Sequence, residues 1–192
     1  MARSPIIQTL VAFAVVFTLQ VAASVINGEE LYRVLFILSL PLEVNAWTLV
    51  TSVYAHAGAD HLVWNAIALI LFGWPVARAT SRMKFHAFFI ATGAIAGAAQ
   101  LLVPVYLPVE VSASGVLGAS GAVFAVMGYL LSGNRVSAGL ADRLEVPFWV
   151  AVVLSALLAV AITWATASPR AALIAHFTGL LLGLVAGRLR IL

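Results

Sequence analysis

The chain has 192 residues, of which 64% are hydrophobic and only 9% are charged. Soluble domains carry about 25% charged residues, so this composition excludes an ordinary soluble fold and predicts an integral membrane protein. Cysteine is absent, which excludes disulfide frameworks and thiolate metal sites. The net charge of +3 does not indicate nucleic-acid binding, because the basic residues are scattered at the ends of apolar runs.

Six stretches are apolar enough to cross a bilayer as helices, which takes about 20 mostly apolar residues each. The second and fourth are short, as expected of helices that begin below the membrane surface. No room remains for a soluble domain, so we expect a single membrane domain over residues 1–192, folded as an all-α bundle of six transmembrane helices. The six stretches cover residues 6–26, 61–77, 84–103, 115–133, 147–167 and 170–189.

The basic residues predict the orientation, because Lys and Arg are enriched in cytoplasmic loops. With the N-terminus in the cytoplasm, only Arg33 and Arg170 of the 10 basic residues fall outside. An even number of spans then places both termini in the cytoplasm. The basic residues that fall inside are Arg3, Arg78, Arg82, Lys84, Arg135, Arg143, Arg188 and Arg190.

The first stretch has a second interpretation as a cleaved signal peptide. Arg3 precedes its apolar core, and the small residues Ala22, Ala23 and Ser24 lie near its end. The apolar run is longer than the 7–15 residues usual for a signal core. Its removal would also leave five spans, so we favour a transmembrane helix.

Residues 28–60 form the longest connection, on the outer side of the membrane. Within it, the stretch Leu31–Leu42 is too short to span the bilayer and too apolar to float in water. Two interpretations remain open. The loop is partly embedded in the membrane interface, or it packs over the ends of the helices.

Polar residues from three stretches are expected in one layer near the outer surface. Ser120 lies about five residues into the fourth stretch and His176 about six residues into the last, so both lie roughly 7–10 Å deep. His61 and Asn65 begin the second stretch from the same side. Polar side chains within spans face the protein interior or a water-filled cavity.

The glycine pattern predicts that the helices carrying Ser120 and His176 touch. Gly179 and Gly183 share one helix face with His176, and glycines at such spacing let another helix approach closely. Gly118 and Gly121 similarly leave the surface beside Ser120 without side chains, so that a neighbouring helix can approach.

Contact between these faces would put the two side chains within hydrogen-bond reach. A serine hydroxyl is a weak nucleophile that needs an adjacent base, which His176 would supply. His61 and Asn65 lie four residues apart on one face and could both donate to a developing oxyanion. The backbone N–H of Ser120 would be a third donor.

These residues resemble the motifs of the rhomboid family of intramembrane serine proteases, over essentially the whole chain. Residues 56–65 resemble its His-x4-His-x3-Asn pattern, and residues 118–121 resemble its nucleophile motif, here Gly-Ala-Ser-Gly. Residues 175–183 resemble its Ala-His-x-x-Gly-x-x-x-Gly motif. Their order and their assignment to the second, fourth and sixth spans also agree.

The resemblance implies a role for each matching residue. Ser120 would be the nucleophile and His176 the general base, without a third triad member. His61, Asn65 and the Ser120 backbone N–H would form the oxyanion hole. His56 would be a structural or solvent-channel residue above the site.

The resemblance also implies partners and location. Transmembrane proteins would be the substrates, membrane lipids would surround the chain, and no metal or cofactor would be needed. The minimal six-helix form implies a multi-pass protein of a prokaryotic cell membrane, with its active site opening to the extracytoplasmic side. The oligomeric state, the natural substrate and the cleavage-site preference are left open.

Two positions depart from the family pattern. Thr48 follows Trp47 where the family often has Arg, which puts the usual anchoring of the first outer loop in doubt. Phe124 stands where the family often has Tyr stacked under the histidine. Phenylalanine keeps the aromatic packing and loses the hydroxyl.

Two other functions compete with proteolysis. A catalytically inactive rhomboid-like protein that binds membrane clients would be expected to lack Ser120 or His176, and the chain keeps both. A metal-dependent membrane enzyme or transporter would use His56, Asp60 and His61 with His176. The chain has no His-Glu-x-x-His signature and no acidic residue in the middle of a span.

Overall fold

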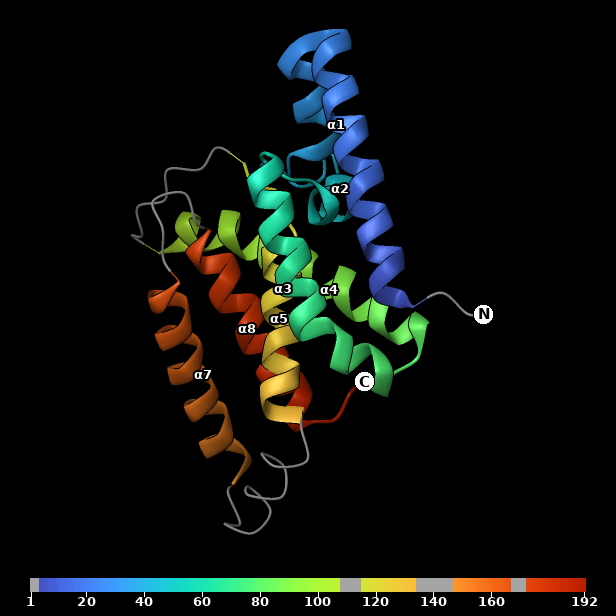
Figure 1. Ribbon diagram of the computed structural model, residues 1–192. Helices are drawn as coiled ribbons and strands as arrows, with labels where there is room; N and C mark the ends of the chain where they lie inside the picture. Colours follow the sequence, from blue (N-terminus) through green and yellow to red (C-terminus); the bar gives the residue numbers. More distant parts are fainter. Residues whose placement is uncertain (1–3, 108–114, 134–146, 167–171) are drawn as a thin grey trace.

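The computed structural model describes residues 4–107, 115–133, 147–166 and 172–192, and these ranges fold as helices joined by loops (Figure 1). A single isolated β-bridge is found among them. The helices, in chain order, are α1 (Pro5–Phe36), α2 (Thr48–Tyr54), α3 (Ala59–Ala79), α4 (Arg82–Tyr106), α5 (Ser120–Gly133), α7 (Phe148–Ala165) and α8 (Leu173–Arg188).

Within the described ranges, four helical segments are long and apolar enough to cross a membrane. They are Pro5–Ile26 within α1, Ala59–Ala79, Arg82–Tyr106 and Phe148–Ala165. The apolar helices α5 and α8 are shorter, with 14 and 16 residues. Each predicted apolar stretch therefore overlaps with a helix, and the expected all-helical architecture is confirmed in the described ranges, while the number of six spans stays a prediction.

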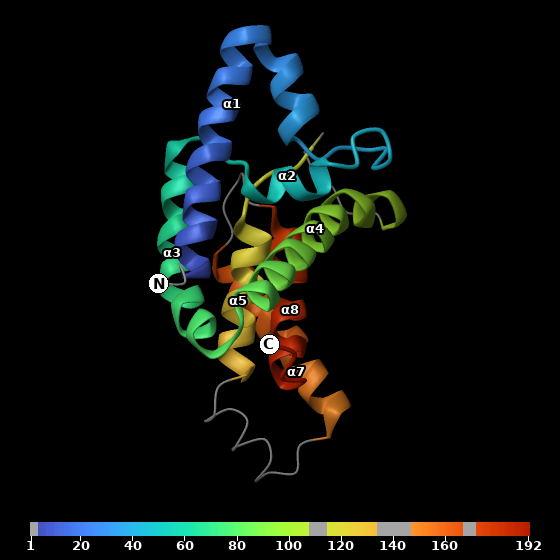
Figure 2. The same ribbon diagram turned by 90° about the vertical axis from the view of Figure 1, so that its right-hand side faces the viewer.

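The helix α5 lies inside the bundle. It packs against α8, α4 and α3, and the first two views both show these helices around it (Figures 1 and 2). The helix α7 packs chiefly against α8 and stands at one side of the bundle (Figure 1). This arrangement places the start of α5 among other helices.

The contact between α5 and α8 brings their backbones together. A Cβ atom built on Gly179 would lie 2.0 Å from the carbonyl oxygen of Gly121, and one on Gly183 would lie 2.0 Å from that of Ala125. A Cβ atom on Gly128 of α5 would likewise meet the carbonyl of Leu180. Such separations need glycine, because any side chain would push the two backbones apart.

The first helix turns back on itself. The ribbon of α1 rises above the bundle and doubles back (Figure 2), and Gly28 within it has a φ of +59°. Glycine adopts this left-handed conformation without the steric cost that other residues incur. The returning arm carries part of the apolar Leu31–Leu42 stretch down towards α2.

The returning arm packs over the helix ends, which is one of the two interpretations of this loop. Phe36 is buried with Ala23 of α1 and Ala55, and Leu31 packs against them. Leu38 is fully buried and forms the isolated antiparallel bridge with Val116. The next residues remain exposed and apolar, among them Leu40, Val44 and Trp47.

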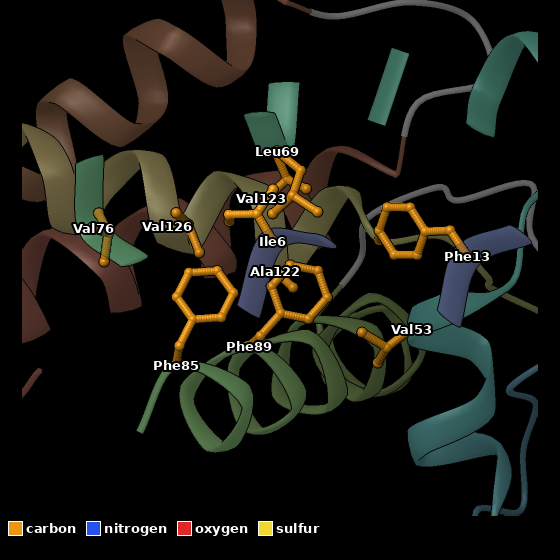
Figure 3. Close-up of a cluster of buried hydrophobic side chains, with 11 residues drawn as sticks. Ile6, Phe13, Val53, Leu69, Val76, Phe85, Phe89, Ala122, Val123 and Val126 are labelled. Atoms are coloured by element: carbon orange, nitrogen blue, oxygen red, sulfur yellow. The ribbon is translucent and has the colours of Figure 1, made fainter. Parts of the chain in front are cut away.

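A cluster of buried side chains joins the first five helices (Figure 3). Two phenylalanines of α4, Phe85 and Phe89, stack with ring centroids 6.2 Å apart near its centre. The cluster fixes α1, α2 and α3 relative to the helix that carries Ser120. Its labelled members are Ile6, Phe13, Val53, Leu69, Val76, Phe85, Phe89, Ala122, Val123 and Val126.

The predicted start of the fourth span is wrong by five residues. Residues 115–119 are not helical, and α5 begins at Ser120. Val116 exchanges backbone hydrogen bonds with Leu38 at 2.9 and 2.8 Å, and Gly118 has a φ of +131°. Neither conformation is compatible with an α-helix, so Ser120 lies in the first turn rather than deeper in the helix.

We predict that Gly183→Ala destabilises the protein. The new methyl group would meet the Ala125 backbone, and such overpacking costs about 1–3 kcal/mol. This cost exceeds the stabilisation that alanine gains over glycine from its higher helix propensity. Gly97→Ala is the matched control, since its methyl group would meet side chains and no backbone, the end of Leu38 at 3.1 Å and Val116 at 3.6 Å. Thermal unfolding in detergent should show a lower Tm for Gly183→Ala alone, and equal Tm values would contradict the tight contact.

Candidate active site

The structure brings Ser120 and His176 together from separate helices. The Nε2 atom of His176 lies 3.0 Å from the Oγ atom of Ser120, a normal hydrogen-bond distance. Ser120 is the first residue of α5, and His176 lies in the first turn of α8. The close contact of the two helices thus places a hydroxyl beside an imidazole.

The imidazole of His176 rests on an aromatic ring. Phe124, one turn after Ser120 on α5, stacks with it at a centroid distance of 4.4 Å and an interplanar angle of 21°. The Nδ1 atom of His176 is buried and has no hydrogen-bond partner among the described residues. The ring is therefore held by stacking and by Ser120, with no carboxylate oriented towards it in these ranges.

The ring of His61 lies against the segment that leads into Ser120. A Cβ atom built on Gly118 would lie 2.6 Å from Cε1 and 3.1 Å from Nε2 of His61. Gly118 also has a positive φ, so both its backbone and the nearby ring require glycine. Its N–H donates to the carbonyl of Ser52 on α2 at 2.9 Å, which fixes the loop in place.

The second nitrogen of His61 has a defined partner. The backbone N–H of Ala57 donates to Nδ1 of His61 at 3.3 Å. In a neutral imidazole one nitrogen accepts and the other carries the proton. Accepting at Nδ1 places the proton on Nε2, the nitrogen that lies nearer to Gly118.

Asn65 lies one turn after His61 and is 6% exposed. Its Nδ2 atom donates to the carbonyl of His61 at 2.8 Å. An amide has two N–H donors, so this bond fixes the side chain on its own helix and leaves the second donor for another acceptor.

His56 packs between two rings. Its ring lies 4.8 Å from that of Phe13 on α1 and 5.3 Å from that of His61, both edge to face. It is 1% exposed, and neither ring nitrogen has a hydrogen-bond partner in the described part of the chain. We expected a structural or solvent-channel residue at this position, and that role stays a prediction. In the same ranges, no three His, Cys, Asp or Glu side chains are grouped so that they could hold a metal ion.

Two buried glutamines near these residues were missed by the sequence analysis. Gln100 of α4 is 3% exposed, and its Oε1 atom accepts the backbone N–H of Ala175 at 3.0 Å. Ala172, which precedes α8, has no side chain that could cap the helix. Gln100 therefore supplies from another helix the acceptor that an N-cap residue would normally provide. Its signal in the sequence is an uncharged polar residue inside an apolar stretch.

The second missed residue, Gln20 of α1, is 2% exposed. Its side-chain amide forms two hydrogen bonds with the backbone of His56. It thereby fastens the loop before α3 to the first helix.

The helices α4, α5 and α8 meet directly beneath the pair. A Cβ atom on Gly121 would lie 2.7 Å from the Cβ atom of Ala96 and 3.6 Å from the carbonyl oxygen of Ala175. Small residues therefore allow all three helices to approach at the level of Ser120.

The loop that joins α1 to α3 is anchored by hydrogen bonds, and Thr48 makes one of them. Its hydroxyl donates to the carbonyl of Asn45 at 2.6 Å, and the side chain is 1% exposed. The indole N–H of Trp47 donates to the carbonyl of Val34 at 2.9 Å. Thr51 donates in the same way to Leu35 near the end of α1.

A comparison with known protein families gave a match. The family model described as Rhomboid domain matches residues 43–191, which contain every candidate site residue and all helices except α1. A comparison with curated proteins gave no match.

We predict that Gln100→Leu loosens the first turn of α8. Loss of a helix cap costs about 1 kcal/mol, so amide hydrogen exchange at Ala175 should become roughly fivefold faster. Thr163→Val is the control, because the hydroxyl of Thr163 on α7 is buried without a partner among the described residues. Unchanged exchange in Gln100→Leu would show that the bond does not stabilise the helix end.

Proposed function

Because the chain belongs to the rhomboid family, whose activity is serine proteolysis within membranes, we propose that it is an intramembrane serine endopeptidase. Its substrates would be membrane proteins, cut in or near their transmembrane segments. The observation that carries the proposal is the 3.0 Å contact between His176 Nε2 and Ser120 Oγ. A hydroxyl beside an imidazole is the arrangement that nucleophilic catalysis by serine requires.

In the proposed reaction, Ser120 Oγ attacks the carbonyl carbon of the scissile bond while His176 Nε2 takes the hydroxyl proton. The tetrahedral intermediate then collapses, the C–N bond breaks, and His176 gives the proton to the leaving amine. An ester joins the substrate to Ser120. Water, deprotonated by His176, hydrolyses this ester and restores the free serine.

The developing oxyanion would be held by three donors. Nε2–H of His61, Nδ2–H of Asn65 and the backbone N–H of Ser120 are the candidates. Ser120 is the first residue of α5, so its N–H has no acceptor within the helix. The positive end of the helix dipole also favours negative charge at this position.

The proposal includes the placement in the membrane. Six spans with both termini in the cytoplasm would form one membrane domain over residues 1–192, with the site near the extracytoplasmic side of a prokaryotic cell membrane. The unequal distribution of basic residues supports this orientation. We further propose that substrates approach between α3 and α7, since α7 packs chiefly against α8.

We predict that Ser120→Ala and His176→Ala each abolish cleavage of a transmembrane substrate by purified protein in liposomes. Losses on the order of 10⁴-fold or more are typical when one member of such a pair is removed. A chelator should have no effect on the wild type. Cleavage that survives Ser120→Ala would overturn the assignment, and chelator-sensitive cleavage would favour a metal-dependent enzyme.

A fluorophosphonate probe separates an inactive protein from an untested substrate preference. The probe should label wild-type Ser120 and fail to label His176→Ala. Absence of labelling in the wild type, together with absence of cleavage, would favour the client-binding function.

We predict that Asn65→Ala leaves weak residual activity. Removal of one oxyanion donor typically lowers kcat by about 10²–10³-fold, which is less than the loss expected for Ser120→Ala. Val63→Ala on the same helix is the control, since its side chain is 48% exposed. Equal kcat values for Asn65→Ala and wild type would remove Asn65 from the mechanism.

A further inference from the structure

We propose that Gln20 on α1 is a positioning residue for the oxyanion hole. Through the backbone of the His56–Ala57 segment, it holds His61 in the tautomer that carries a proton on Nε2. This inference rests on the proposed function, because it assigns His61 as an oxyanion donor.

The side-chain amide of Gln20 forms two hydrogen bonds with the backbone of His56. The Nε2 atom of Gln20 donates to the carbonyl of His56 at 3.2 Å, and the N–H of His56 donates to Oε1 of Gln20 at 2.9 Å. Both residues are at most 2% exposed. The two partners also fix the orientation of the amide, since the flipped amide would place donor against donor and acceptor against acceptor.

Because Gln20 is buried, breaking its hydrogen bonds to the loop before α3 would cost free energy, so the contact constrains that loop. A polar side chain within a membrane span is expensive unless its hydrogen bonds are made. Loss of the contact would leave two backbone groups of His56 unpaired in a buried place, at about 1–3 kcal/mol for each group. The His56 backbone is therefore tied to α1, a helix that lies before the residues 43–191 matched by the family model.

The residue after His56, Ala57, contacts the ring of His61 directly. The N–H of Ala57 donates to Nδ1 of His61 at 3.3 Å, so the orientation of this peptide group determines which nitrogen of His61 accepts. With Nδ1 accepting, the proton resides on Nε2. The opposite tautomer would have a lone pair at Nε2 and could not donate to an oxyanion there.

A packing contact from the same helix supports this arrangement. Phe13 of α1 lies 4.8 Å from the ring of His56, which in turn lies 5.3 Å from the ring of His61. The first helix thus contacts both the backbone and the ring of His56. Because Phe13 retains its contact in a Gln20 variant, we expect a smaller effect than removal of His61 itself.

The test compares Gln20→Met with Gln8→Met. Methionine has a similar length and flexibility without hydrogen-bonding groups. Gln8 is the matched control, because it lies on the same helix and its Oε1 atom pairs with Nε2 of a different histidine, His86, at 3.0 Å. We expect Gln20→Met to lower kcat by about 10–100-fold with KM little changed, since removing an oxyanion donor outright costs about 10²–10³-fold. Gln8→Met should keep the wild-type kcat.

A double-mutant cycle identifies the residue through which Gln20 acts. In a His61→Ala background, Gln20→Met should change kcat by less than about twofold, because residues that act through one another are not additive. Equal fold-losses in both backgrounds would show that Gln20 acts through general stability, and would overturn the inference.

The tautomer of His61 can be measured directly and independently of activity. Nitrogen-15 NMR of the His61 ring should show a protonated Nε2 in the wild type and a loss of this preference in Gln20→Met. A wild-type ring protonated on Nδ1 would overturn the inference even if the variant did not fold. An unchanged tautomer in Gln20→Met would also overturn it and leave the serine dyad untouched. Cleavage that survives Ser120→Ala would instead overturn the proposed function while the NMR result stood.

Discussion

The direct backbone contact between α5 and α8 is the constraint on which the rest of the structure depends. Within lipid there is no hydrophobic force that joins apolar helices, so close van der Waals contact has to hold them together. Gly179 and Gly183 provide it by letting the carbonyls of Gly121 and Ala125 touch α8. Ser120 directly precedes this contact on α5, and His176 lies three residues before it on α8. The separation of hydroxyl and imidazole is therefore a consequence of the glycine spacing.

Neutral polar groups then orient what the glycines bring together. Gln100 caps the helix that carries His176, and Gln20 holds the loop that precedes His61. In a medium of low dielectric constant such bonds are strong, and an unmade bond is costly. The site is thus oriented by amides, aromatic stacking and backbone groups drawn from five helices and their loops, including one that precedes the matched family domain.

Much of the fold and of the candidate site is predictable from the sequence, for identifiable reasons. The apolar stretches locate the helices because bilayer thickness fixes their length, and the spacing of Gly179 and Gly183 indicates which face of the last helix meets a neighbour. The extended path through Val116 and Gly118 was not predictable, because an apolar stretch does not reveal where its backbone leaves the helix. Gln20 and Gln100 were missed for a related reason. Their partners lie 36 and 75 residues away, and only the folded chain brings them together.

The shortness of α5 has a consequence for any peptide that reaches it. Its 14 residues span only about 21 Å, against a hydrocarbon core of about 30 Å. Because α3, α4 and α8 surround it, this shortfall lies inside the protein, where polar groups and water can replace lipid. Unfolding a helical peptide in lipid costs several kcal/mol of free energy for each backbone group that loses its hydrogen bond. Beside the first residue of α5, those groups would find hydrogen-bond partners. Under the proposed function, discrimination among membrane segments would then depend on how readily each one gives up its own helical hydrogen bonds at that depth, more than on the side chains beside the scissile bond.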